Sequence, residues 1–341
     1  MKNKVRAIVL VILAICSIIL GIGIGSVFIH PSDTVRICSD FFLGTSNPSD
    51  IDKVSYGLVT GIRLPRVMMA FLAGSAIAVS GTVMQSVLKN PLASSYGLGV
   101  SSGAGLGAVI MMVYGTGLGS GLSYLLPMVA TLFGFGTVLL TLMFVKQVDK
   151  NLSNNTIILA GMVVSLFLNA IMNMLATYNA EFTHRILLWQ LGTFAGRDWT
   201  AIGVLAVVLV SSLILFQWHS KEMDILTFGE EQAMTIGVET KREKWLLIGV
   251  TSLLTGTAVS FVGIIGFVDL IAPHVVRRFF GVSHKWVVPM SALFGGMFMI
   301  LCDLAGRTIT SPREIPVGSI TALLGVPFFL YIYFISRRSK L

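Results

Sequence analysis

Two arginines stand where a long apolar run begins, and their side chains can do chemistry at a membrane surface. The stretch GIRLPRVMMAFLAGSAIAVSGTVMQ, which starts at Gly61, places Arg63 and Arg66 at the threshold of a run that reaches Met84. A run of this length is expected to lie in lipid, with the guanidinium groups at one of its surfaces. Such groups either snorkel to lipid phosphates and anchor their helix, or bind the carboxylates of a partner.

Two aspartates lie within or beside apolar runs. Asp303 precedes Arg307 by four residues, a spacing that allows an ion pair on one helix face. Asp269 lies near the start of a short apolar run. An ionised acid is costly to bury in a membrane, so Asp269 is a candidate pathway residue; alternatively it complements the dipole of its own helix. An ion-coupled carrier would usually need more such acids.

Motifs for catalysis or for nucleotide binding do not occur in this sequence. There is no G-x-x-x-x-G-K-[ST], no H-E-x-x-H and no G-x-S-x-G. The cysteines and histidines show no metal-type or redox-type spacing. We therefore expect no catalytic residue, metal or cofactor in this chain; the residues concerned are Cys16, Cys38, Cys302, His30, His184, His219, His274 and His284.

The composition indicates a membrane protein. Of the 341 residues 55% are hydrophobic and 12% are charged, too few charges to cover a soluble domain of this length. Apolar segments of near 20 residues recur, which predicts an all-α polytopic protein with one domain over residues 1–341. Ten spans are predicted: 7–29, 64–87, 93–114, 122–145, 156–178, 200–217, 245–263, 266–280, 286–305 and 315–335.

The positive charges give the orientation. With the N-terminus inside, sixteen of the 24 lysines and arginines fall on the cytoplasmic face and eight on the outer face, as the positive-inside rule requires. Both termini are then cytoplasmic, which needs an even number of spans. The net charge of +8 therefore concerns topology and not binding to nucleic acid. The eighth span, 266–280, is the shortest and contains Pro273.

Two stretches look internally related. The triplet AVS occurs at Ala78–Ser80 and at Ala258–Ser260, and each copy lies in a span that has a charged start. Each span is followed by a proline, Pro91 or Pro273, that begins a broken helix. Because the second copy lies five spans after the first, the copies run in opposite directions, which predicts an inverted repeat of the kind common in transporters.

The longest inner loop, residues 219–244, is amphipathic and carries several acidic residues. It is predicted to form one or two short amphipathic helices at the membrane surface. It is either a solvated connector or a docking surface for a soluble partner. Four acids in it stand out against the basic inner face: Asp224, Glu230, Glu231 and Glu239.

Taken together, these stretches resemble the FecCD family of ABC-transporter permeases, the membrane subunits that import iron–siderophores, haem and vitamin B12. The matching segments are RLPRVMMAFLAGSAIAVSGTVMQ, KNPLASSYGLGVSSGAGLGA, GFVDLIAPHVVRRFFG and CDLAGRTITSPREIPVGSITALLGVPFFLYIYFISRR, in order over residues 63–338. The resemblance implies the type II importer permease fold, with ten helices and both termini inside.

The resemblance also implies roles for particular residues. A substrate-binding protein would dock on the outer face, its acids meeting Arg63, Arg66 and Arg307. KNPLA resembles the loop that narrows the cytoplasmic exit, here Asn90 and Leu92. Asp269 departs from the small or apolar residue usual in the family. FGEEQAMTIGV resembles the helices that fit a groove on the ATPase, with Gly229, Glu230, Glu231, Ala233 and Gly237 as the matched positions.

The implied function is that of half a permease dimer in a bacterial cytoplasmic membrane. The second permease subunit would be identical or a paralogue. Two ATP-binding cassette subunits would bind ATP and Mg²⁺, and a binding protein would deliver an iron chelate or similar cofactor. The permease would act by alternating access. An ion-coupled secondary transporter, dependent on Asp269, is the alternative that the inverted repeat alone would allow.

Overall fold

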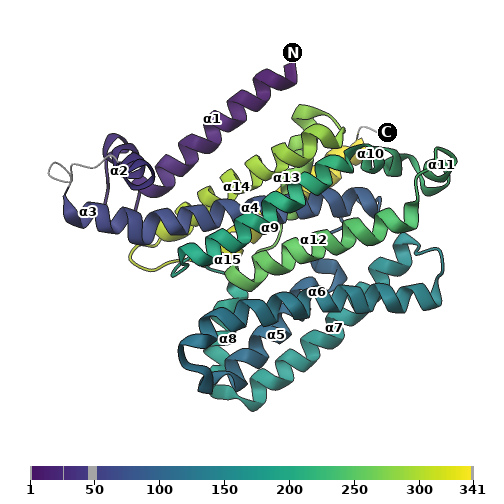
Figure 1. The fold of residues 1–341 in the computed structure, drawn as a ribbon, viewed down its shortest axis with the longest axis horizontal. Helices are drawn as coiled ribbons and strands as arrows, with labels where there is room; N and C mark the ends of the chain where they lie inside the picture. Colours follow the sequence, from purple (N-terminus) through teal and green to yellow (C-terminus); the bar gives the residue numbers. More distant parts are fainter. Residues whose placement is uncertain (1, 26, 45–51, 339–341) are drawn as a thin grey trace.

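A computed structural model describes residues 2–25, 27–44 and 52–338, and every regular element in these ranges is a helix (Figure 1). Residues 1 and 339–341, the two chain ends that are predicted to lie in the cytoplasm, are outside the described ranges. Each of the ten predicted spans contains a helix: α1 (Lys2–Gly23), α4 (Leu64–Val87), α5 (Val100–Tyr114), α6 (Leu122–Val148), α7 (Asn154–Tyr178), α9 (Trp199–Trp218), α12 (Thr240–Val262), α13 (Val268–Phe280), α14 (His284–Thr308) and α15 (Val317–Arg338).

The helices differ in their ability to cross a bilayer. Among the described residues, seven candidate spans are long and apolar enough to do so, and α5, with 15 residues, is a shorter apolar helix. Helix α13 has 13 residues, which is about 20 Å of helix against about 30 Å of hydrocarbon. Residues before it, such as Ile265, are buried in protein, which is where irregular backbone is tolerated at membrane depth.

Several boundaries differ from the predicted spans. Helix α1 ends at Gly23, not at residue 29, and α5 begins at Val100, not at residue 93. Additional short helices lie in the connections: α2 (Pro31–Leu43), α3 (Lys53–Leu58) with a π-helical turn (Val59–Arg63), and α8 (Thr183–Leu191). Hydropathy detects long apolar runs, and these segments are short or carry polar residues, so the sequence analysis did not predict them.

Close helix approaches form the centre of the bundle. A Cβ atom on Gly74 would overlap the backbone of Gly295, so only two glycines allow α4 and α14 to meet there. In the same way, a Cβ on Gly81 would overlap the backbone of Asp269 in α13. In Figure 1, α5–α8 lie below α12, and α4, α9, α13 and α14 lie above it. Glycines of α5 also meet α6.

The two related halves exchange contacts. Helix α4 packs against α12 and α13, and α12 packs against α5. Ser95, in the segment after α4, forms a hydroxyl–hydroxyl hydrogen bond of 2.9 Å with Thr255 of α12. Gln85 of α4 donates its side-chain amide to the carbonyl oxygen of Asp269, in the helix after α12 (3.2 Å). Each half thus holds the segment that follows the other's long helix, an arrangement typical of an inverted repeat.

Candidate functional sites

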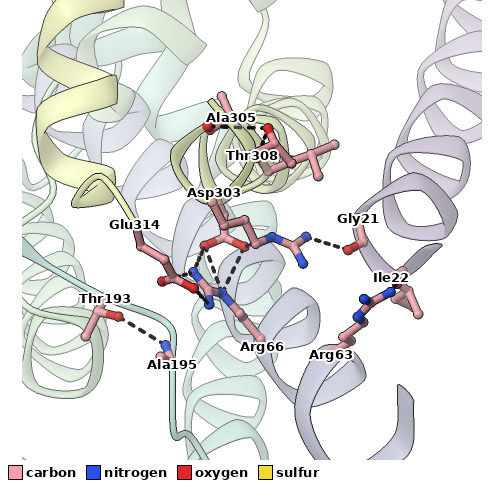
Figure 2. Close-up of polar contacts among 12 residues, drawn as sticks. Gly21, Ile22, Arg63, Arg66, Thr193, Ala195, Asp303, Ala305, Thr308 and Glu314 are labelled. Atoms are coloured by element: carbon pink, nitrogen blue, oxygen red, sulfur yellow. Dashed lines mark hydrogen bonds and ion pairs between the residues drawn. The ribbon is translucent and has the colours of Figure 1, made fainter. Parts of the chain in front are cut away.

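Arg63 is buried at one end of the bundle. Its guanidinium donates hydrogen bonds to the carbonyl oxygens of Ile22 (3.0 Å), Gly23 (3.1 Å) and Val27 (2.5 Å), and the residue is only 4% exposed (Figure 2). These carbonyls lie at and just beyond the C-terminus of α1, where helical acceptors lack partners and where a positive charge is favoured. Arg63 therefore caps the C-terminus of α1.

Arg66 is shared by two carboxylates. Its Nε and Nη2 atoms approach Asp303 at 3.0 and 2.9 Å, and Nη1 and Nη2 donate to Glu314 at 2.8 and 2.9 Å (Figure 2). Asp303 is 1% exposed, whereas the Glu314 side chain is 47% exposed. Its hydrogen bonds with Arg66 lower the pKa of Glu314, which lies in the connection between α14 and α15. One carboxylate is thus part of the core and the other faces outward.

Arg307 completes this cluster. Its Nε lies 3.2 Å from Asp303 Oδ2, which is the ion pair that the four-residue spacing allows, and Nη2 donates to the carbonyl of Gly21. The side chain is 7% exposed. The three arginines that the sequence analysis places at a docking surface are therefore gathered at one end of the bundle. They are largely buried here, and each has partners within the chain.

Asn90 and Leu92, predicted from KNPLA to narrow the exit, lie at the other end of α4. We call residues 89–96 the exit segment. Asn90 accepts a hydrogen bond from the backbone N–H of Leu92 through its side-chain oxygen (2.9 Å), and Leu92 is 50% exposed. Helix α13 holds this segment from the side. The Asp269 carboxylate accepts from the Ser94 hydroxyl, and His274 Nε2 lies 3.3 Å from the Pro91 carbonyl.

Asp269 is enclosed by protein. It is 1% exposed, and it lies in the first turn of α13, where the helix dipole favours a carboxylate. Its hydrogen bond from Ser94 ties α13 to the segment that follows α4. These contacts give Asp269 a positioning role for the exit segment; its role in a substrate path stays a prediction.

The loop 219–244 forms two short helices, α10 (Ser220–Phe228) and α11 (Glu230–Thr235), as predicted. We call residues 220–237 the coupling segment. Gly229 separates the helices with a φ of +139°, a backbone conformation that favours glycine. Gly237 has a φ of +94°. Of the other matched positions, Ala233 is buried, whereas Glu231 is exposed.

Two buried polar links attach the coupling segment to the bundle, and sequence reasoning missed both. Lys244 of α12 is 1% exposed and donates to Glu230 (2.7 Å) and to the carbonyl oxygen of Leu152 (2.8 Å). The second link runs from Asp224 through His284 to Ser86. The acids of residues 219–244 were the available signal, since a buried cation needs a carboxylate partner.

The order Ser86, His284, Asp224 resembles a hydrolytic triad, but its setting differs. Ser86 is 5% exposed, and its hydroxyl lies within hydrogen-bond distance of the Thr82 carbonyl one turn earlier in α4 (3.0 Å) as well as of His284. A nucleophile must reach a substrate carbonyl, and this hydroxyl lies between packed helices. We therefore interpret the three residues as a structural link.

Comparisons with known proteins now decide the family. The model of the FecCD transport family matches residues 11–334. The chain belongs to the FecCD transport family. It is 37% identical over 322 residues to the uncharacterized ABC transporter permease protein YvrB of Bacillus subtilis (strain 168), covering 94% of this chain and 91% of that protein.

Other known proteins are similar over nearly the whole chain. The Fe(3+)-citrate import system permease protein YfmE of Bacillus subtilis (strain 168) is 31% identical over 342 residues, 99% of this chain and 98% of that protein. A solved inward-facing structure of a transporter assigned to the metal-chelate ABC type has a TM-score of 0.81 and 29% identity, covering 95% of this chain and 97% of that one.

Membership of the FecCD family confirms the predicted fold class, that of an ABC importer permease. Permeases of this kind are the membrane subunits of ABC transporters, whose ATPase lies in partner subunits. The predicted site residues form two groups in this FecCD protein. Arg63, Arg66 and Arg307 lie at one end of the bundle, and the exit and coupling segments lie at the other.

Proposed function

We propose that this chain forms half of the translocation path of an ATP-driven importer for iron–siderophore complexes, or for haem or cobalamin. The observation that carries the proposal is the match of the FecCD transport family over residues 11–334, with relatives such as the Fe(3+)-citrate import permease along the whole chain. Two such permease subunits, identical or paralogous, would enclose the path. The importer would lie in the bacterial cytoplasmic membrane, with both termini in the cytoplasm.

The coupling segment supports a partner-driven mechanism. Its two helices lie at one end of the bundle in Figure 1 and are attached to it by buried polar contacts. Glu231 of α11 is exposed, and Gly229 separates α11 from α10, so α11 would be the part that meets the partner subunit. Two ATPase subunits, closing on ATP and Mg²⁺, would move this segment and switch the side to which the path opens.

The arginine cluster, which consists of Arg63, Arg66 and Arg307, supports a docking surface with few accessible charged groups. Among Arg66, Asp303, Arg307 and Glu314, the exposed side chain is that of Glu314. Its carboxylate occupies the outward side of the Arg66 guanidinium. A carboxylate of a substrate-binding protein would reach Arg66 by replacing Glu314, while Asp303 would keep its buried contacts. Arg63 would act indirectly, by holding the end of α1.

Transport into proteoliposomes tests this function. The chain is reconstituted with its ATPase and binding protein, and uptake of labelled ferric siderophore, haem and cobalamin is compared with ATP and with a non-hydrolysable analogue. Uptake that needs ATP hydrolysis and one of these cargoes supports the importer. Uptake driven by a proton gradient without ATPase, and lost in Asp269→Asn, would overturn it in favour of a secondary carrier.

A further inference from the structure

A continuous polar chain crosses three helices at the end of the bundle that carries the coupling segment. His284 Nδ1 lies 2.6 Å from Asp224 Oδ1 of α10, and His284 Nε2 lies 2.5 Å from the Ser86 hydroxyl of α4. His284 is 1% exposed and Ser86 is 5% exposed. Because a carboxylate can only accept, Nδ1 carries a proton, and the other ring nitrogen faces Ser86. One imidazole thus joins α10 to α4.

Asp224 is fixed at its own end by further bonds. Its Oδ1 atom accepts the backbone N–H of His284 at 2.8 Å, and Oδ2 accepts the Ser283 hydroxyl at 3.1 Å. The carboxylate of α10 therefore occupies the N-terminus of α14, where unpaired N–H groups and the helix dipole favour an anion. A displacement of α10 must move the start of α14 with it, or break these bonds.

The far end of the chain lies where α4 ends. Ser86 is in the last turn of α4, and the exit segment with Asn90 follows directly. Arg277 of α13 joins at the same place, with Nη1 2.5 Å from Gln85 Oε1 and Nη2 3.4 Å from the Ser86 hydroxyl. The last turn of α4 is therefore held by α13 and α14 together.

Other described contacts of α10 include the 2.9 Å contact of its N-cap residue His219 with Glu243 of α12, and apolar packing. Met223 and Leu226 are buried at 0% and 1% exposure, and apolar packing is not directional. Such a surface resists separation but permits sliding. Hydrogen bonds fix distance and angle together, so the chain through His284 sets the register between α10 and α4.

We propose that Asp224, His284 and Ser86 transmit the displacement of the coupling segment to the cytoplasmic end of α4 and hence to the exit segment. They are positioning residues for transport, and the proposal rests on the proposed importer function. Both bonds are short, the imidazole is rigid and 1% exposed, and the Asp224 side chain is 35% exposed, so a displacement of α10 reaches α4 through few rotatable bonds. Without the link, the ATPase would still turn over, but its motion would reach the exit less often.

The first test compares Ser86→Ala with Ser75→Ala in the reconstituted importer. Ser75 is a matched control, because its buried hydroxyl also joins α4 to α14, by donating to the Ala292 carbonyl at 2.8 Å, and it lies outside the chain. Cargo imported and ATP hydrolysed are measured in the same vesicles. We expect Ser86→Ala to keep its ATPase rate within about twofold and to import about fivefold less cargo per ATP, as loss of one buried hydrogen bond implies. An unchanged ratio overturns the proposal.

A second variant separates the contact between His284 and Ser86 from the bond between His284 and Asp224. In His284→Asn, the side-chain amide can still donate to Asp224 but is too short to reach Ser86. We expect the same fall in cargo per ATP as in Ser86→Ala. If His284→Asn keeps the wild-type ratio, the bond with Asp224 alone is sufficient, and the link to α4 has no role in coupling.

Hydrogen exchange of the purified chain tests the link without transport, so a failed importer assay and a failed link are distinguishable. Asp224→Asn is compared with Ser283→Ala, which removes one bond to the same carboxylate and leaves His284 in place. We expect Asp224→Asn to raise amide exchange about fivefold at residues 86–92 as well as at 284–288, and Ser283→Ala to change only the latter. Exchange at 86–92 that does not respond to Asp224→Asn overturns the proposal, whatever the cargo.

Discussion

Replacing Arg63 separates two roles for this residue, a docking group for a binding protein and a brace for helix α1. In the structure the guanidinium is 4% exposed and serves three carbonyl oxygens at 2.5–3.1 Å. In Arg63→Ala these acceptors lose their donor while they remain largely enclosed. The structure therefore predicts that the main effect falls on folding and not on docking.

The size of the effect follows from the bonds. A hydrogen bond to a charged group is worth about 1.5–3 kcal/mol, and three of them sharing one guanidinium are not additive. In the variant, water can also hydrate some of the carbonyl oxygens at the end of α1. We expect Arg63→Ala to lower the free energy of unfolding by about 3–5 kcal/mol, and Arg63→Lys to lose about half of that, because an ammonium lacks the planar fork.

Thermal unfolding of the purified chain in detergent, monitored by tryptophan fluorescence, measures this loss of stability. A loss of this size lowers the unfolding temperature by about 5–10 °C. Arg185→Ala is the control, since Arg185 is exposed on α8 and its removal is expected to change stability by less than about 0.5 kcal/mol. The reasoning is refuted if Arg63→Ala unfolds at the temperature of Arg185→Ala but no longer captures the binding protein, because Arg63 would then be a docking group.

Three further perturbations follow from local geometry. Gly81→Leu forces a side chain into the backbone of α13, so we expect a loss of at least about 3 kcal/mol, or no folded chain by gel filtration; normal unfolding would show that this approach is not needed. The Ser153 hydroxyl and N–H hold the pKa of Asp149 at about 2, below its usual 3.8. This contribution is complete above pH 3.8 and is lost as pH falls through about 2, so Asp149→Asn should flatten the unfolding temperature measured across that range. Lys244→Met removes the cation that holds the coupling segment, and we expect faster amide exchange over residues 229–237; unchanged exchange would mean that apolar packing holds α11.

Hydropathy predicted the helices well because a membrane span must be long and apolar. All ten predicted spans contain helices, and seven candidate spans among the described residues have the length and hydropathy of a crossing helix. Helix α13 is an informative exception. Residues 266–280 form a helix of only 13 residues with Asp269 near its start, because the bundle encloses it and lipid does not set its length.

The partners of the charged residues could not be predicted in the same way. The i, i+4 spacing of Asp303 and Arg307 was visible in the sequence because it is local. Arg66 and Glu314 are 248 residues apart, and their pairing depends on how α4 packs against α14. A sequence pattern places each charge at a membrane surface, but it cannot show whether a neighbouring helix already supplies the counter-charge.

The two sets of polar contacts together constrain how this permease can move. At one end of the bundle Arg66 of α4 binds Asp303 of α14, and at the other end Ser86 of α4 meets His284 of α14. Between them, the two backbones meet at Gly74 and Gly295, where a side chain on either glycine would overlap the other helix. A pair fastened at both ends and along its length moves as one body. A displacement at the coupling segment should therefore tilt α4 and α14 together, so the path must open where this pair meets other helices, and not between its two members.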